Sequence, residues 1–177
     1  MLNEKITLIP GHTMRSVVPL GTTRMTVPGR RSKEPDLTLR PATRARANNR
    51  WPSVVIEVGY SEKLPQLRLN AQWWLINLAS QTRCVIVIHV ARNPNRLHLE
   101  CWSMAPPQRI TRHTPPLVPR CEQEFGIDSA GPITTTHAQL TIPYTSVFDL
   151  PHPAGADIIF TLAELSSFAT WVFSQWI

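Results

Sequence analysis

Residues 51–62, with the sequence WPSVVIEVGYSE, decide the predicted fold of this chain. The run Val54–Val58 is β-branched at every position but one and contains no turn residue, which is typical of a buried strand. The exception is Glu57, whose carboxylate lies inside the run. Burying a charge costs on the order of several kcal/mol unless a partner, a metal or a proton compensates it. We therefore expect Glu57 to have such a partner.

A second strand is predicted just upstream, within residues 33–41, KEPDLTLRP. Alternation places Leu37 and Leu39 on one face of this strand. The opposite face carries Asp36, Thr38 and Arg40. If the two strands pair, Asp36 and Glu57 point into one polar notch, which is the strongest indication of function in the sequence.

Length and composition indicate an irregular segment, residues 1–31, followed by a single domain, residues 32–177. A chain of 177 residues with 42% hydrophobic residues can bury a substantial core. Its 17 prolines against 7 glycines predict long extended connections. The net charge of +6 and the pI near 9.9 favour an anionic partner such as DNA or RNA.

Cysteine content and hydropathy bear on localisation. The three cysteines are an odd number without a CxxC pair, which favours a reduced, intracellular protein, nuclear or cytoplasmic. No apolar run reaches about 18 residues, so the sequence predicts no membrane span. Pro10, Gly11 and His12 interrupt the N-terminus too early for a signal-peptide core. The composition leaves the oligomeric state open.

Two groups of basic residues precede residue 51. In the N-terminal segment, Ile6–Ile9 and Arg15–Leu20 are predicted as short strands, and a loose basic group follows them: Arg24, Arg30, Arg31 and Lys33. Residues 40–50, RPATRARANNR, lack periodicity and predict a loop. The candidate nucleic-acid-binding residues of this loop are Arg44, Arg46 and Arg50. The alternative for both groups is ordinary solvated surface.

A helix and a buried strand follow. Apolar residues at helical spacing form one face of the helix: Leu64, Leu67, Ala71, Trp74, Leu75 and Leu78. Pro65 suits the first turn, and Ser61 is a candidate cap. The near-continuous apolar run Cys84–Val90 is the next strand. A strand, a helix and a buried strand in this order predict parallel pairing with a right-handed crossover.

The remaining chain gives fewer signals. Residues 97–102 alternate and predict a hairpin with the preceding strand. Residues 105–136 are rich in Pro, Thr and Arg and predict a long surface connection. Residues 138–144 predict a strand with Leu140 and Ile142 facing inward. A C-terminal helix is predicted from a Thr161–Glu164 capping box and a periodic apolar stripe: Leu162, Leu165, Ala169, Val172, Phe173 and Trp176.

Taken in order, these motifs resemble the restriction-endonuclease-like PD-(D/E)XK superfamily, and more narrowly uncharacterised fungal proteins with a KEPD…WPSVVIEVGYSE pattern and a WWL helix. The resemblance covers about residues 32–102. It implies an α/β fold with a mixed central sheet flanked by helices, with the first core helix missing. It also implies that Asp36 and Glu57 hold Mg²⁺ or Mn²⁺, and that a nearby lysine helps water attack a phosphodiester.

The chain departs from the superfamily at the lysine, because Gly59 stands two residues after Glu57. In relatives whose basic residue has moved to the helix, the matching positions here are Asn70 and Gln72, which are neutral. Lys63 and Arg68 are the remaining cations. The candidate catalytic residues are therefore Asp36, Glu57, Lys63, Arg68 and Gln72.

Three functional hypotheses remain open. The first is a Mg²⁺-dependent nuclease-like domain, active or degenerate. The second is a catalytically inactive scaffold that binds nucleic acid or a protein. The third makes Glu57 structural and pairs it with Arg68 or Arg40. The six histidines show neither HxH nor HExxH spacing, which argues against zinc.

Overall fold

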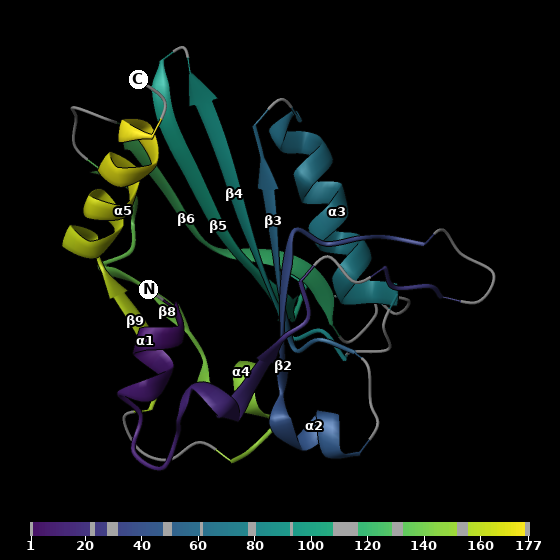
Figure 1. Ribbon diagram of the computed structural model, residues 1–177. Helices are drawn as coiled ribbons and strands as arrows, with labels where there is room; N and C mark the ends of the chain where they lie inside the picture. The colour runs from purple at the N-terminus through teal and green to yellow at the C-terminus, as the bar shows by residue number, and fades with distance from the viewer. Residues whose placement is uncertain are drawn as a thin grey trace.

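The computed structural model of the protein describes residues 2–21, 24–27, 32–47, 51–60, 62–77, 81–92, 94–107, 117–128, 133–151 and 156–175. These residues form an α/β fold with a seven-stranded mixed sheet, a separate two-stranded sheet and packed helices (Figure 1). The α/β class predicted from the sequence is confirmed.

The bounds of the elements are as follows. The strands are β1 Val17–Pro19, β2 Leu37–Pro41, β3 Val54–Gly59, β4 Cys84–Arg92, β5 Asn95–Ala105, β6 Val118–Asp128, β7 Ile133–Thr134, β8 Gln139–Ile142 and β9 Ile158–Thr161. The helices are α1 Leu2–Thr7, α2 Ala42–Arg46, α3 Leu64–Asn77, α4 Tyr144–Phe148 and α5 Leu162–Ser174, and a 3-10 helix, η1, spans Met14–Ser16.

The large sheet has its strands in chain order, β1 to β7, and β8 pairs with β9. Among the described strand pairs, β3–β4 alone is parallel, and α3 connects its two strands. This is the pairing predicted from the strand–helix–strand pattern. No helix in the described part of the chain is long and apolar enough to cross a membrane.

Two apolar cores lie on opposite faces of the large sheet. On one face, α3 packs Leu67, Ala71 and Trp74 against valines of β3 and β4. On the other face, α1, α5 and the β8–β9 pair enclose the larger core, which includes Ile6, Leu140 and Leu165. Figure 1 shows α3 and α5 on the two sides of the sheet. The alternating residues of β3 therefore face different cores, and Glu57 faces α3.

The strongly periodic segments fold as predicted. In α3, the predicted face is buried at Leu67, Ala71, Trp74 and Leu75. In α5, Thr161 and Glu164 form the predicted capping box. Leu140 and Ile142 of β8 face inward. Ser61, Leu78 and Trp176 lie outside the described residues.

Three local predictions are wrong, and the bounds of a fourth element differ. Residues 6–9 were expected as a strand, but Ile6 belongs to α1, which precedes the sheet and is too short for periodicity to reveal. Residues 42–46 of the expected loop form α2. Residues 118–128 of the expected connection form β6, which pairs with β5 through the backbone although its first half is polar. Of the expected strand 138–144, residue Tyr144 begins α4.

A pH-dependent contact joins the N-terminal segment to α4. His12 Nε2 lies 2.9 Å from the Tyr144 hydroxyl, and its ring packs against Phe148. Its Nδ1 is buried and has no hydrogen-bond partner among the described residues. Burial lowers the pKa of His12 below its ordinary value. As the pH falls, the unfolded chain therefore takes up this proton first, and stability is lost from about pH 6.5 down to the folded pKa.

We expect His12→Gln to lose less stability than the parent between about pH 7 and pH 5. Glutamine can replace the Nε2 hydrogen bond, but it does not titrate. Urea denaturation of both proteins at several pH values measures the difference. Equal pH dependence would assign the titration to other groups, such as His89, whose pKa burial also lowers.

Candidate functional site

The register of β2 and β3 brings the two predicted acids together. Leu37 pairs with Ile56, and continuing this register by one position places Asp36 opposite Glu57. Asp36 is exposed just before β2, and its Oδ2 accepts a hydrogen bond of 2.7 Å from the backbone N–H of Val58. The carboxylate of Asp36 is therefore held against β3 beside Glu57.

Glu57 is buried beneath α3, and both of its oxygens have donors. The indole N–H of Trp74 donates to Oε1. The amide of Asn70 donates to Oε2 at 3.5 Å and also to Glu62 Oε1 at 3.3 Å. Lys33 Nζ lies 3.9 Å from Glu57 Oε1. One helix thus supplies neutral donors, and one lysine supplies a positive charge.

The electrostatics of this site favour a cation. Burial raises the pKa of Glu57 above its ordinary value; the Trp74 hydrogen bond and Lys33 oppose this rise, and the charges of Asp36 and Glu62 add to it. Two further carboxylates therefore act on Glu57, which has one lysine beside it. A divalent cation would relieve this excess of negative charge.

Lys33 reaches the site from the chain segment before β2. Met25 and Lys33 form an antiparallel bridge through two backbone hydrogen bonds, at 2.8 and 2.9 Å. Met25 is buried in the α3 core, which anchors the bridge. Lys33 was expected only in the basic group before Asp36, so its role beside Glu57 was missed. The sequence signal for this contact is that Lys33 lies three residues before Asp36.

The other candidate catalytic residues have different surroundings. Lys63 is exposed at the start of α3, and Gln72 is half-buried on that helix. In the described part of the chain, neither side chain makes a polar contact with Glu57. Arg68 donates to Glu100 on β5 instead, at 2.8 Å from its Nε. The hypothesis that Glu57 pairs with Arg68 is therefore wrong.

Arg44 is a structural residue, contrary to its prediction as a phosphate-steering side chain. It is 6% exposed. Its guanidinium makes two contacts with the carboxylate of Asp149 and donates to the carbonyl of Trp51 at 3.2 Å. The local pattern could not show this, because Asp149 is far away in the sequence. The side chain of Arg46 and all of Arg50 lie outside the described part of the chain.

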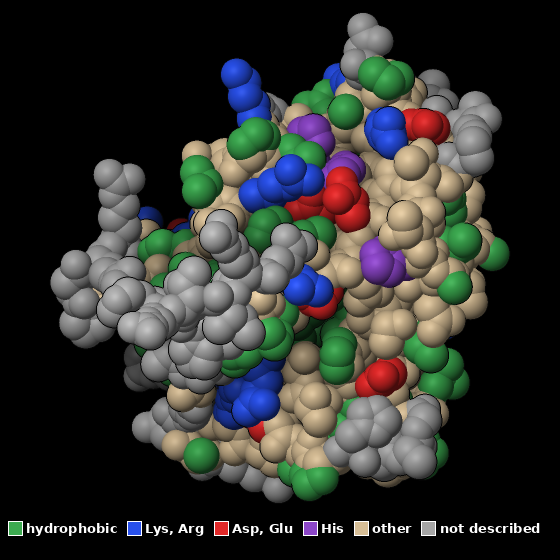
Figure 2. Space-filling model, turned by 180° about the vertical axis from the view of Figure 1, so that it is seen from behind, with side chains coloured by type: hydrophobic (Ala, Val, Ile, Leu, Met, Phe, Trp, Pro, Cys, Tyr) green, Lys and Arg blue, Asp and Glu red, His purple; other side chains and the backbone are tan. Residues whose placement is uncertain are grey.

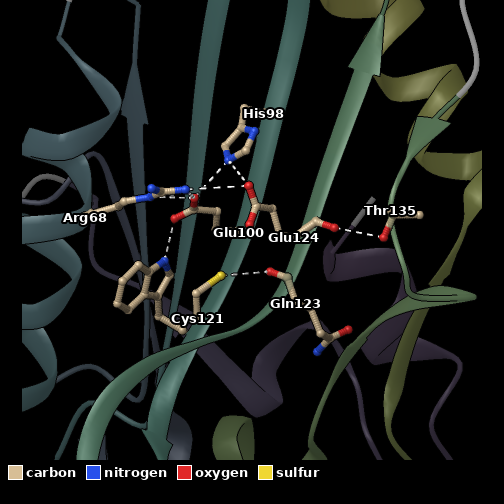
Figure 3. Close-up of polar contacts among 8 residues, drawn as sticks. Arg68, His98, Glu100, Cys121, Gln123, Glu124 and Thr135 are labelled. Carbon is tan, nitrogen blue, oxygen red and sulfur yellow. Dashed lines mark hydrogen bonds and ion pairs between the residues drawn. The ribbon is translucent and has the colours of Figure 1, made fainter.

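A second polar cluster lies beneath the same helix. Arg68, His98, Glu100 and Glu124 converge from α3, β5 and β6 (Figure 3). Figure 2 shows one face of the molecule on which acidic, basic and histidine side chains lie close together. Sequence reasoning considered Arg68 alone of these residues, because their grouping depends on strand register.

Comparison with known proteins assigns no family. No protein-family model, no curated protein and no solved structure matches the chain. The geometry and charge of the residues described above are therefore the basis for a function.

Proposed function

We propose that this protein is a PD-(D/E)XK-like phosphodiesterase that cleaves DNA or RNA with Mg²⁺ or Mn²⁺. The order of the elements along the chain supports the proposal. Asp36 lies just before β2, Glu57 lies in β3, and helix α3 and the parallel strand β4 follow. The observation that carries it is the position of Lys33, 3.9 Å from Glu57, where it supplies the cation missing at Gly59.

Packing explains why the lysine comes from another segment. A Cβ atom placed on Gly59 would lie 2.5 Å from Cδ1 of Leu67, which is fully buried between α3 and the sheet. A side chain at residue 59 would therefore displace the buried Leu67 side chain. Glycine avoids this overlap, and Lys33, at the bridge with Met25, would provide the charge.

The residues present fit a hard divalent cation. Asp36 and Glu57 would hold the ion, since Mg²⁺ takes one or two carboxylates together with water and phosphate oxygens. The bound ion would stabilise negative charge on the phosphodiester during cleavage. Trp74 and Asn70 fix the orientation of Glu57. The ammonium group of Lys33 would donate to a phosphate oxygen or to the attacking water.

A second candidate function is a catalytically inactive scaffold that binds nucleic acid or a protein through the same fold. The burial of Glu57, which is 4% exposed, favours it. A carboxylate that accepts from Trp74 and Asn70 has part of its coordination capacity already used. The two candidates differ in whether metal-dependent cleavage occurs.

We expect the parent protein to cleave single- or double-stranded DNA or RNA in the presence of Mn²⁺ or Mg²⁺. Lys33→Met keeps the aliphatic stem but removes the ammonium, so cleavage should fall by about 10²-fold or more, while Mn²⁺ binding is retained. Lys63→Met is the matched control and should cleave like the parent, because Lys63 is exposed and, among the described residues, Lys33 is the lysine that lies beside Glu57.

Gel assays on labelled oligonucleotides measure cleavage, and calorimetry measures Mn²⁺ binding. Metal binding without cleavage of any of these substrates would favour the scaffold. Equal cleavage by the parent and Lys33→Met would remove Lys33 from the proposed site.

A further inference from the structure

One row of residues crosses the sheet beneath α3 and carries two separate acidic groups. Glu57 of β3 pairs with Val87 of β4, Val87 pairs with Glu100 of β5, and Glu100 pairs with Glu124 of β6. Residues paired in this way point to the same face. Because Val87 lies between them, Glu57 and Glu100 are two strand spacings apart, about 9–10 Å. The second group is therefore distinct from the Asp36–Glu57 site.

Glu100 is fully buried, and hydrogen-bond donors surround its carboxylate (Figure 3). Its Oε1 accepts from Arg68 Nε and from His98 Nε2, both at 2.8 Å, and its Oε2 accepts from Trp102 Nε1 at 2.7 Å. Burial raises the pKa of Glu100, but these hydrogen bonds outweigh it and bring the pKa to about 2. Glu100 is thus an ionised carboxylate held inside the protein.

His98 connects this buried carboxylate to an exposed one. Its Nε2 lies 2.8 Å from Glu100 Oε1 and 3.2 Å from Glu124 Oε1. Glu124 is half exposed, and Arg68 Nη2 lies 3.6 Å from its Oε1. The ligand atoms of His98, Glu100 and Glu124 all lie within 4.8 Å of one another. One imidazole and two carboxylates at this spacing can surround a single ion.

We propose that His98, Glu100 and Glu124 bind a divalent transition-metal ion of the Zn²⁺ or Co²⁺ type. Imidazole together with carboxylate suits these ions, whereas Mg²⁺ prefers oxygen ligands alone. His98 and Glu100 are two residues apart on one strand, and Glu124 comes from the neighbouring strand. Histidine spacing alone predicted no zinc site, because it does not reveal carboxylates that strand pairing brings together.

In this structure, Arg68 supplies the positive charge beside Glu100 and Glu124. Its guanidinium bridges Glu100 and Glu124, and 39% of its side chain is exposed on α3. A long exposed side chain can turn into solvent when a doubly charged ion replaces it.

A cavity provides access and room for further ligands. It has a volume of about 260 Å³ and is lined by Arg96, His98, Glu124, Gly126 and Thr134–Thr136. Two of the three proposed ligands thus line an open space. Three protein ligands leave a coordination position for water or a small anion, as in metal sites that are not purely structural.

The test is titration of the untagged Asp36→Asn protein with Co²⁺ at about pH 7.5, monitored by visible absorption. The Asp36→Asn substitution disables the first site. We expect one equivalent of Co²⁺ to give a coordination spectrum, and Zn²⁺ to displace it. His98→Gln or Glu124→Gln should weaken binding by more than the roughly 10–100-fold that loss of an outer-shell partner causes. Glu122→Gln, on the same strand, is the matched control and should bind like its parent.

Arg68→Ala supplies a second readout. The substitution leaves the buried Glu100 carboxylate without its arginine partner, so this variant should be less stable than the parent. Zn²⁺ should then raise its Tm more than that of the parent. If it does not fold without metal, refolding with and without Zn²⁺ gives the same comparison. Absence of a Co²⁺ spectrum, a spectrum unchanged by His98→Gln, or equal Zn²⁺ shifts with and without Arg68 would each overturn the proposal. None of these outcomes depends on nuclease activity.

Discussion

Arg44→Ala is expected to destabilise the protein by about 3–5 kcal/mol, the usual cost of breaking a buried ion pair from one side. Arg44 joins α2 to Asp149 at the end of α4 and also donates to the carbonyl of Trp51. Removing the guanidinium leaves that carbonyl without this donor and leaves Asp149 with Arg83, whose side chain is 45% exposed. Urea denaturation measures the loss of stability.

Arg83→Ala is the matched control, because it removes the exposed partner of the same carboxylate. Exposed ion pairs contribute about 0–1 kcal/mol, so this variant should be close to the parent. If Arg44→Ala loses less than about 1 kcal/mol of stability and also weakens the salt dependence of nucleic-acid binding, Arg44 is a phosphate-contacting residue after all.

The parts of the fold predicted from the sequence are those in which local pattern and burial agree. The buried run of β3 and the apolar face of α3 each cover enough residues to show their period. In contrast, β6 combines a polar first half with a buried second half at Phe125–Ile127, so no single period describes it. Its place is set by backbone pairing with β5, which a pattern of side chains does not encode.

The candidate site divides in the same way. The meeting of Asp36 and Glu57 follows from alternation on two consecutive strands, which the sequence contains. The position of Lys33 depends on Met25, which pairs with it in a β-bridge and is buried in the α3 core. The overlap that a Cβ atom at residue 59 would have with Leu67 depends on how closely α3 approaches β3. Such distances between elements arise only from three-dimensional packing.

Glu57→Gln is expected to abolish the stabilisation of the protein by Mg²⁺ or Mn²⁺ without destabilising the metal-free protein. Because folding raises the pKa of Glu57, its ionised form is disfavoured in the folded state above the ordinary carboxyl pKa. Glutamine removes that charge and can still accept from Trp74. At neutral pH, metal-free stability should therefore be unchanged or higher, and the difference should shrink as the pH falls through the raised pKa of Glu57 and be lost below about pH 4.5.

The parent should gain RT ln(1 + [M]/Kd) from the metal, about 1.4 kcal/mol at ten times Kd, and this gain should vanish in Glu57→Gln. Glu34→Gln is the matched control, because Glu34 is exposed and its ion pair with Arg24 spans 3.8 Å. Chemical denaturation of all three proteins, with and without metal, gives both quantities.

The contrary outcome is that Lys33 and Glu57 form a structural ion pair. Glutamine then leaves the mostly buried ammonium of Lys33 without its counter-charge. The metal-free protein would then lose about 3–5 kcal/mol, and the parent would show no gain from metal. That pair of results would identify the Asp36–Glu57 site as part of the protein's core and exclude it as a metal centre.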